Sequence, residues 1–398
     1  MRRRLCVVAW LSLLLARVAL AAPALVASPG PDPVLLAKPA AEARPGLWIR
    51  PYLQAVGAET ATLRFETVLP QAVKVTLSVG DAAAPVCSLD DTKLRVHEVK
   101  AMGLTPETAY VFRVSASGEA PGEARVTTWP AAPKTVRFFV YGDTRTRPAE
   151  HKKVCDAMAR KAAGHLFVLH SGDLVARGRS YPLWKTEFFD PAADLLARLP
   201  VCPVPGNHEE ASELYRAYFT LPATEWYWSL RCGPVYVLGL DSQRGLDSKS
   251  WLTSEQGQWL RDEMPKADTP WRLALLHTPL YSLGNHGALK PETGEPKEAA
   301  MAWARKEFQE LLRKHGFQLT LSGHDHLYER SVREGLTMVT SGGGGAPLYS
   351  AGPPAQNPHS VKLVSKTHYM DITATDTTLE ATVYDAEDHE IDSFKLTR

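Results

Sequence analysis

The feature that most constrains this fold is a series of short apolar segments, each ending in polar residues. These residues are Asp143, Asp173, Asn207 with His208, His277, and His324 with His326. The carboxyl ends of strands in an open α/β sheet meet at one edge, where ligands bind, so we expect these side chains to converge. Every segment except that of His277 has a glycine just before its polar residue, which lets the chain turn sharply toward a common centre.

The expected cluster has the composition of a metal site. Two carboxylates, one amide and three imidazoles suit Zn, Mn or Fe better than Ca or Mg. One carboxylate shared between two ions would fit the count. Two ions about 3.5–4 Å apart can clamp a phosphate and stabilise both its entering and its leaving oxygen. The set therefore predicts phosphoester hydrolysis.

Each residue also has a structural interpretation when taken alone. An Asp after a strand is commonly a turn former or a helix cap. His324 and His326 could lie on one face of a strand. It is the complete series that favours a metal site. His170, on an apolar strand, is expected to be a core or outer-sphere residue.

The pattern changes along the chain. Leu47 to Thr128 contain short alternating strands without a helical period, which predicts a small all-β sandwich at 47–129. A Pro-rich linker follows Trp129. Apolar strands then alternate with amphipathic helices, which predicts an α/β domain at 135–398. Expected helices lie near 150–163, near Thr253 with Gln256 in a capping box, and from about Lys297 to Gly316.

The N-terminus predicts secretion. Three arginines precede an apolar run over 5–15, and Ala19-Leu20-Ala21 fits a signal peptidase site, so we expect a signal peptide at 1–21. The alternative is a membrane anchor, but the run is shorter than the roughly 20 residues of a span. Residues 22–46 are rich in Ala and Pro, which predicts a flexible leader. The mature chain is therefore expected to be secreted or periplasmic and not bound to a membrane.

Charge and cysteines exclude little else. Removal of residues 1–21 takes away four arginines and no acids, so the net charge changes from +1 to 1 − 4 = −3, which gives no reason to expect nucleic acid as a partner. Cys87, Cys155, Cys202 and Cys232 remain. A Cys202–Cys232 disulfide and four buried thiols are both compatible with the sequence.

The ordered motifs GD, GD, GNHE, H and GHDH resemble those of calcineurin-like metallophosphoesterases. Residues 323–330, GHDHLYER, resemble the GHxHxYER segment of purple acid phosphatases, and residues 277–281 resemble their HxPxY segment. Residues 50–54, RPYLQ, and the turn at 104–110 resemble the fibronectin type III-like domain of the plant-type enzymes. With the loop at 342–349, the resemblance covers nearly all of the chain after the signal.

The resemblance implies an α/β catalytic domain built as a two-sheet sandwich flanked by helices, behind a fibronectin III-like sandwich. It implies two divalent or mixed-valence ions (Fe, Zn or Mn). The first would be held by Asp143, Asp173 and His326, and the second by the bridging Asp173 with Asn207, His277 and His324. His208 would be the general acid, with Glu209 orienting it, and His286 would contact phosphate. Arg145 is a further candidate phosphate contact on the chemistry of its guanidinium group and not on the resemblance.

The implied function is hydrolysis of phosphate esters, most simply monoesters, by attack of a metal-bound hydroxide on phosphorus. A phosphodiesterase or nucleotidase would use the same ligands, and the partners would be small phosphate esters. A non-catalytic surface-binding protein with a decayed metal site is the alternative from a different class.

Two departures from the family motivate that alternative. Arg145 occupies a position where many relatives have histidine, and Ala176 stands where purple acid phosphatases have an iron-ligating tyrosine. Water or Tyr181 could complete the first metal's ligands. Arg145 could fork onto phosphate oxygens or form a surface ion pair.

Overall fold

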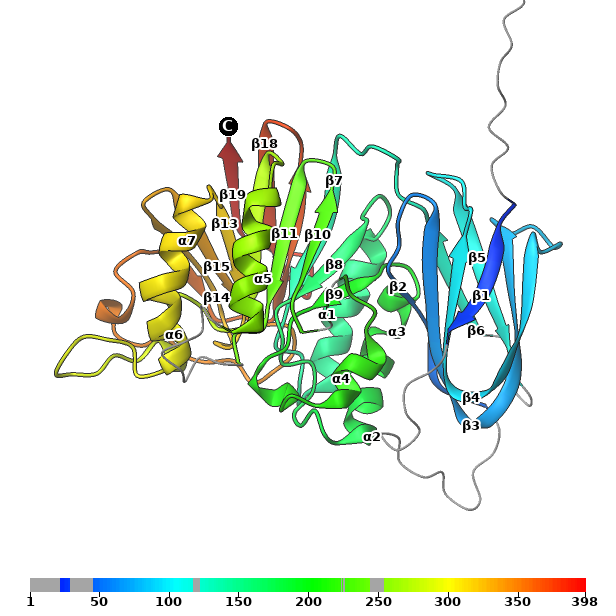
Figure 1. The fold of residues 1–398 in the computed structure, drawn as a ribbon. Helices are drawn as coiled ribbons and strands as arrows, with labels where there is room; N and C mark the ends of the chain where they lie inside the picture. The colour runs from blue at the N-terminus through cyan, green and yellow to red at the C-terminus, as the bar shows by residue number, and fades with distance from the viewer. Residues whose placement is uncertain (1–21, 29–45, 117–121, 223, 225, 244–253) are drawn as a thin grey trace, which may run out of the picture.

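The computed structural model describes residues 22–28, 46–116, 122–222, 224, 226–243 and 254–398. Figure 1 shows an all-β N-terminal part in blue and cyan beside a larger part that contains all the labelled helices. The predicted signal peptide at 1–21 and most of the predicted leader lie outside the described residues.

The N-terminal part is one hydrogen-bonded sheet that closes around its own core. Two long strands, β3 and β4, pair along most of their length, while β2 pairs with the first half of β3 and β5 with the second half. Strands β2 to β6 contribute Leu53, Phe65, Val99, Phe112 and Val126 to a single buried cluster. The strands are β1 (Ala24–Ser28), β2 (Leu47–Gln54), β3 (Thr60–Val79), β4 (Cys87–Met102), β5 (Ala109–Ser115) and β6 (Gly122–Thr127).

The turn before β5 has a feature of β-sandwiches. The Tyr110 hydroxyl accepts a hydrogen bond from the Thr105 N–H at 3.0 Å, five residues upstream. A tyrosine that bonds back to the upstream backbone is typical of immunoglobulin-like sandwiches. The all-β character is confirmed, and the fibronectin III-like assignment stays a prediction that this turn supports.

The leader prediction is wrong for residues 24–28. Ala24–Ser28 form β1, which pairs antiparallel with the edge strand β4, from Ala24 opposite Met102 to Ser28 opposite Glu98. Leu25 packs against the sandwich core. The open edge of β4 offers unpaired backbone groups, which an apolar extended segment can satisfy, so a tertiary contact overrides the local composition.

The larger part is built from two sheets that pack face to face. The first sheet has the order β10-β11-β12-β13-β15-β14-β16, and the second has the order β19-β18-β17-β7-β8-β9. Their strands are β7 (Val136–Tyr141), β8 (Phe167–His170), β9 (Val201–Pro203), β10 (Trp228–Cys232), β11 (Val235–Leu240), β12 (Trp271–Leu276), β13 (Leu319–Ser322), β14 (Tyr328–Arg333), β15 (Leu336–Ser341), β16 (Ser360–Val364), β17 (His368–Ala374), β18 (Thr378–Asp385) and β19 (Glu390–Thr397).

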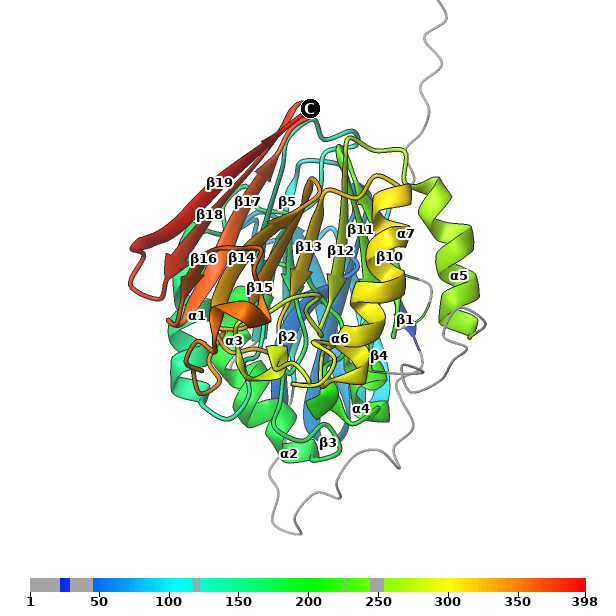
Figure 2. The same ribbon diagram turned by 90° about the vertical axis from the view of Figure 1, so that its left-hand side faces the viewer.

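Alternation along the strands assigns side chains to two cores. Val235 and Val237 of β11 face the other sheet, whereas Tyr236 and Leu238 face the helices on the outside. Helices α1 and α3 cover the β7-β8-β9 side, while α5 and the α6–α7 segment cover the β11-β12 side, as Figures 1 and 2 show. The expected two-sheet sandwich flanked by helices is confirmed.

The helices follow the predicted pattern with one difference in capping. The expected helix near Thr253 begins after Ser254, whose hydroxyl accepts from the Gly257 N–H, and the Gln256 side chain bonds the Asp241 backbone instead of forming a capping box. The helical segments are α1 (Pro148–Lys161), α2 (Tyr181–Leu183), η2 (Trp184–Phe189), α3 (Asp190–Leu196), η3 (Asn207–Glu209), α4 (Glu213–Tyr218), α5 (Glu255–Glu263), η5 (Met264–Lys266), η6 (Asn285–Gly287), α6 (Ala299–Trp303), η7 (Ala304–Phe308), α7 (Gln309–Lys314) and η8 (Pro354–Gln356).

The cysteines and the helices bear on two alternatives from the sequence, a disulfide and a membrane anchor. Cys87, Cys155, Cys202 and Cys232 are free thiols, so of the two readings the structure has the unbridged one. Among the described residues, no helix combines the length and the apolar character needed to cross a bilayer.

The two parts are joined by a buried polar face of β3. Leu63 and Phe65 point into the sandwich core, while the alternating residues Arg64 and Glu66 point toward the larger part and are buried there. Arg64 donates to the Ala217 carbonyl at 2.5 Å and pairs with Glu98 at 3.0 Å. Polar residues of this strand therefore serve as an interface rather than as a solvated face.

Glu66 is the centre of this interface. Its carboxylate accepts hydrogen bonds from the hydroxyls of Tyr181 and Tyr218 and pairs with Arg95 at 2.9 Å. Its side chain is 1% exposed. Burial raises the pKa of Glu66 to about 6, although Tyr181 and Arg95 oppose the shift. The folded state thus binds the proton of Glu66 more tightly than the unfolded chain does.

This shift predicts a pH-dependent stability. A raised acid pKa stabilises the fold fully below the ordinary value of 4.5 and loses that effect as the pH rises through about 6. The difference of about 1.5 units corresponds to about 2 kcal/mol. We expect urea unfolding at pH 4.5 and pH 7 to show this loss in the wild type, and Glu66→Gln to lack it. The exposed Glu59→Gln is the control, and an unchanged pH dependence in Glu66→Gln would contradict the assignment.

Candidate metal centre

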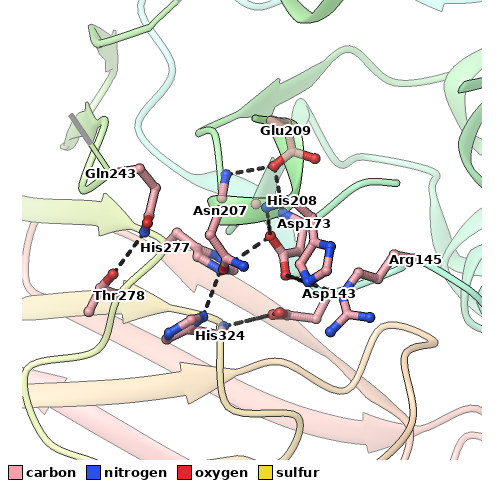
Figure 3. Close-up of polar contacts among 12 residues, drawn as sticks. Asp143, Arg145, Asp173, Asn207, His208, Glu209, Gln243, His277, Thr278 and His324 are labelled. Carbon is pink, nitrogen blue, oxygen red and sulfur yellow. Dashed lines mark hydrogen bonds and ion pairs between the residues drawn. The ribbon is translucent and has the colours of Figure 1, made fainter. Parts of the chain in front are cut away.

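The strand ends bring the predicted ligands together. Asp143 follows β7 and Asp173 follows β8, which are parallel neighbours, while His277 and His324 follow the parallel pair β12 and β13. Asn207 follows the β9 segment. Figure 3 shows Asp143, Asp173, Asn207, His277 and His324 facing one another across the edge where the two sheets meet. The convergence expected from the sequence is therefore present in the structure.

Three of these residues have a left-handed backbone. The φ angles are 58° at Asp143, 57° at Asp173 and 71° at His324. This conformation is uncommon for residues with a side chain, and its cost is typical of functional sites. Hydrogen bonds hold it in place: the Thr144 N–H donates to the Asp173 carbonyl at 3.0 Å, and the Asp143 carboxylate accepts the His324 N–H at 3.0 and 3.1 Å.

Two glycines make room for the carboxylates. A Cβ at Gly206 would lie 2.2 Å from Asp173 Oδ1, and one at Gly323 would lie 2.2 Å from Asp143 Oδ2. Both distances are far below van der Waals contact, so a side chain at either position would displace a ligand. The glycines at 206 and 323 are therefore required because the carboxylate oxygens approach the backbone closely at these two positions.

The second subsite has the geometry of a cation site. His277 Nε2 lies 3.3 Å from Asp173 Oδ1, 3.1 Å from Asn207 Oδ1 and 3.1 Å from His324 Nδ1. Ligand atoms 2.0–2.2 Å from one tetrahedral ion would lie roughly 3.3–3.6 Å apart. His277 donates its Nδ1–H to the Ser171 carbonyl at 2.8 Å, so its Nε2 lone pair faces the centre. The residues present fit a divalent ion.

The first subsite has fewer candidate ligands than the second. Asp143, Asp173 and His326 each bring a ligand atom within 4.8 Å of the others, and all three are buried. His326 Nε2 lies 3.5 Å from Asp143 Oδ1, and its Nδ1–H donates to the Pro347 carbonyl at 2.7 Å. These three residues fit a cation as well. Arg145, which the sequence suggested as a phosphate contact, lies against this subsite.

The electrostatics of the site favour a cation. Burial and the adjacent Asp173 carboxylate raise the pKa of Asp143 well above its ordinary value. The pKa of Asp173 is lowered to about 2 despite its burial, since the carboxylate lies beside the His277 and His208 imidazoles and accepts the His208 backbone N–H at 3.0 Å. Burial lowers the pKa of His277 to about 3, which keeps its imidazole neutral and able to bind metal. The site thus concentrates ligand atoms that positive charge would stabilise.

His208 lies beside this cluster. Its Nδ1–H donates to the Ala176 carbonyl at 2.7 Å, and its Nε2 lies 3.8 Å from Asp173 Oδ2. The side chain is 30% exposed, whereas that of His277 is 0% exposed. His208 therefore borders the ligands from the solvent side without belonging to either subsite.

The prediction that Glu209 orients His208 is not what the structure shows. Both Glu209 carboxylate oxygens accept backbone N–H groups, from Gly206 at 2.6 Å, Asp173 at 2.9 Å and Leu174 at 2.8 Å. A buried carboxylate can tie two loops together in this way because it has several lone pairs. Glu209 holds the backbone of the two loops, and the Ala176 carbonyl orients His208.

The sequence argument missed Glu298. This residue precedes α6, accepts from His324 Nε2 at 2.9 Å and bonds His286 Nδ1. The His286 ring stacks on His324 with centroids 3.6 Å apart, so His286 lies beside the second subsite. A carboxylate that orients a ligating histidine is a common outer-sphere arrangement. Nothing in the local sequence of Glu298 marks it, since only the loop path brings it near His324.

The glycine-rich loop at 342–349 contacts both Asp143 and His326. The Ala346 N–H donates to the Asp143 carbonyl at 2.8 Å, and the Tyr349 ring stacks on His326 with centroids 4.1 Å apart.

His170 is buried, and its Nδ1 accepts the Gly172 N–H at 3.2 Å, which agrees with the prediction that His170 is a core or outer-sphere residue.

Tyr181 does not complete the first subsite in this structure. Its hydroxyl bonds Glu66 of the N-terminal part and accepts from Arg95 at 2.6 Å. The ring stacks on Trp48 with centroids 5.8 Å apart. The suggestion that Tyr181 replaces the tyrosine missing at Ala176 is therefore not supported.

The comparisons with known proteins agree with this geometry. Residues 136–328 match the family model of calcineurin-like phosphoesterases. An uncharacterized Mycobacterium tuberculosis protein is 27% identical over 61% of this chain and 51% of its own length. Human acid phosphatase type 7 is 28% identical over 60% and 57%, and purple acid phosphatase 22 of Arabidopsis thaliana is 28% identical over 60% and 54%.

Solved structures extend the similarity of fold. A purple acid phosphatase from yellow lupin superposes with a TM-score of 0.73 over 87% of this chain and 74% of its own, at 16% identity. PhoD superposes with a TM-score of 0.67 over 89% and 94%, at 14% identity. The chain spans just over half the length of the curated relatives that it matches.

Residues 136–328 thus form a calcineurin-like phosphoesterase domain. Within that class, the chain is a homologue of the purple acid phosphatases. That family implies a centre with two metal ions, to which the two subsites correspond in number.

The absence of a tyrosine at position 176 predicts a colourless protein. The family's colour is understood to come from charge transfer between tyrosinate and ferric iron. We expect purified, iron-loaded and oxidised protein to lack a strong visible band, with iron content measured on the same sample. Tyr181→Phe is the control and should change nothing. A strong band that disappears in Tyr349→Phe would contradict the expectation and identify another phenolate.

Proposed function

We propose that this chain is a metal-dependent phosphoesterase that hydrolyses phosphate monoesters, with His208 as the general acid. The observation that carries the proposal is the convergence of six ligand side chains at one sheet edge, with a histidine beside them that belongs to neither subsite. A decayed, purely binding protein would have no need to retain this complete arrangement.

The ligand assignment follows the two subsites. Asp143, Asp173 and His326 would hold one ion, and Asp173, Asn207, His277 and His324 would hold the other, as Fe, Zn or Mn. When bound, two such ions would lower the pKa of a water molecule and offset the charge of the phosphate.

The other side chains would bind and protonate. His208 is fixed at Nδ1 by the Ala176 carbonyl, so its Nε2 edge faces the site and can donate a proton to the departing alcohol oxygen. Arg145 lies against His326 of the first subsite, and His286 lies against His324 of the second. Both could contact phosphate oxygens, Arg145 through its forked guanidinium.

The remaining expectations belong to this proposal. Substrates would be small phosphate esters, and the protein would act outside the cytoplasm, as the sequence of residues 1–21 predicts. The N-terminal part would be a fibronectin III-like domain at 47–129, rigidly attached to the catalytic domain through Glu66 and Arg64.

A phosphoester panel tests the function. We expect turnover of p-nitrophenyl phosphate that a chelator abolishes and added Zn or Mn restores, with little turnover of bis-p-nitrophenyl phosphate. Asp173→Ala should lose most bound metal, because this carboxylate faces both subsites, while Asp156→Ala on the surface of α1 should keep it. Preference for the bis-ester would indicate a phosphodiesterase, and full activity of metal-free protein would end the proposal.

Leaving-group dependence tests His208. A general acid contributes roughly 10²–10⁴-fold when the leaving group needs a proton. We expect His208→Ala to lower kcat by at least about 10²-fold on alkyl phosphates and far less on nitrophenyl phosphate, whose leaving group is stable without one. His389→Ala, an exposed histidine on the β18–β19 turn, is the control. Equal losses on both substrates would mean that His208 positions phosphate instead.

A further inference from the structure

The Arg145 side chain occupies part of the first subsite. Its Nε lies 3.3 Å from Asp173 Oδ2, and its Nη2 lies 3.4 Å from His326 Nε2. The remaining hydrogen bond runs from Nη1 to the Thr146 hydroxyl at 3.3 Å. The side chain is 15% exposed, so the guanidinium is largely enclosed by the site. Two of the three residues that would hold the first ion are thus contacted by this one cation.

The hydrogen-bond partners of His326 show which of its ring nitrogens carries the hydrogen. Its Nδ1 faces the Pro347 carbonyl, which can only accept, so Nδ1 carries a hydrogen. Its Nε2 faces a guanidinium nitrogen, which can only donate, so Nε2 presents its lone pair. An imidazole nitrogen has one lone pair in the ring plane. A metal ion and the Arg145 N–H therefore require the same lone pair of the same atom.

We propose that Arg145 and a metal ion compete for the first subsite. The second subsite has no such competitor among the described residues, since Asp173 Oδ1, Asn207 Oδ1, His277 Nε2 and His324 Nδ1 face one another without an intervening cationic side chain. The two subsites then differ in their affinity for a metal ion. The second subsite binds the ion tightly. The first binds it weakly, because the ion must displace the Arg145 guanidinium from Asp173 and His326.

The released guanidinium has a use that rests on the proposed function. A phosphate group bound across the ions would offer Arg145 a bidentate acceptor in place of Asp173 and His326. Phosphate and the first ion would then favour each other's binding through Arg145, as reciprocal coupling requires. Before substrate binds, Arg145 would balance the negative charge of the carboxylates, and after substrate binds it would contact the phosphate group.

Metal binding without substrate tests the competition. Metal-free protein is titrated with Zn²⁺ in phosphate-free buffer against a chromophoric chelator, and the bound zinc is counted. We expect one tight and one weak site in the wild type. Arg145→Ala should tighten the weak site by roughly tenfold or more, the scale of a charge-assisted hydrogen bond. Arg147→Ala, which removes an exposed arginine two residues away, should change it by less than about twofold.

A second variant assigns the sites. His326→Ala should abolish the weak site and leave the tight one, which also reports that the variant is folded. If Arg145→Ala changes the weak site no more than Arg147→Ala does, or if His326→Ala removes the tight site, the competition is refuted.

Inorganic phosphate tests the coupling. Its addition should tighten the weak site more in the wild type than in Arg145→Ala, because only the wild type has a guanidinium to transfer. Equal effects of phosphate in both proteins would refute the coupling. A chain that binds zinc in this way but hydrolyses no ester would refute the proposed function alone, so the two failures are distinguishable.

Discussion

The crowding of acceptor atoms at one sheet edge is the constraint on which the rest of this structure depends. Asp143, Asp173 and their imidazole neighbours are buried within a few ångströms of each other, where unpaired carboxylates are costly. The left-handed backbone at three ligands, the glycines that leave no room for a Cβ, and the three amides bound by Glu209 all serve to hold these atoms in place. Positive charge at the centre of this arrangement would stabilise it.

Arg145 and the two cation subsites are two ways of supplying that charge. A guanidinium is always charged and needs no metal, but it has donors only and cannot polarise a water molecule as a metal ion does. Because Arg145 lies against Asp173 and His326, its positive charge balances part of the negative charge of the carboxylates at the first subsite. The departure from the family pattern at position 145 therefore affects metal affinity more directly than substrate recognition.

Paired ionisable side chains also join the N-terminal part to the phosphoesterase domain. Arg64 and Glu66 are buried and Arg95 and Glu98 are partly buried, and each of these ionisable side chains has hydrogen-bonded or ionic partners across or within the interface. Buried ionic groups of this kind fix geometry more than they add stability. They hold the Trp48–Tyr181 stack and thereby place Tyr181 in the interface, away from the site.

The sequence by itself determined which side chains meet at the sheet edge, because strand-end motifs in α/β sheets report position as well as residue type. The series from Asp143 to His326 and the helix-flanked sheets could be predicted from periodicity and turn chemistry. The binding of metal by these side chains belongs to the proposed function. The sequence could not show that Glu298 reaches His324, that Glu209 binds amides rather than His208, that Ala24–Ser28 complete a sheet, or that Glu66 is an interface residue. Those contacts join residues far apart in the chain, or depend on which face of a strand meets another domain. Only the tertiary structure decides them, because local propensity carries no information about a partner brought in by the path of the chain.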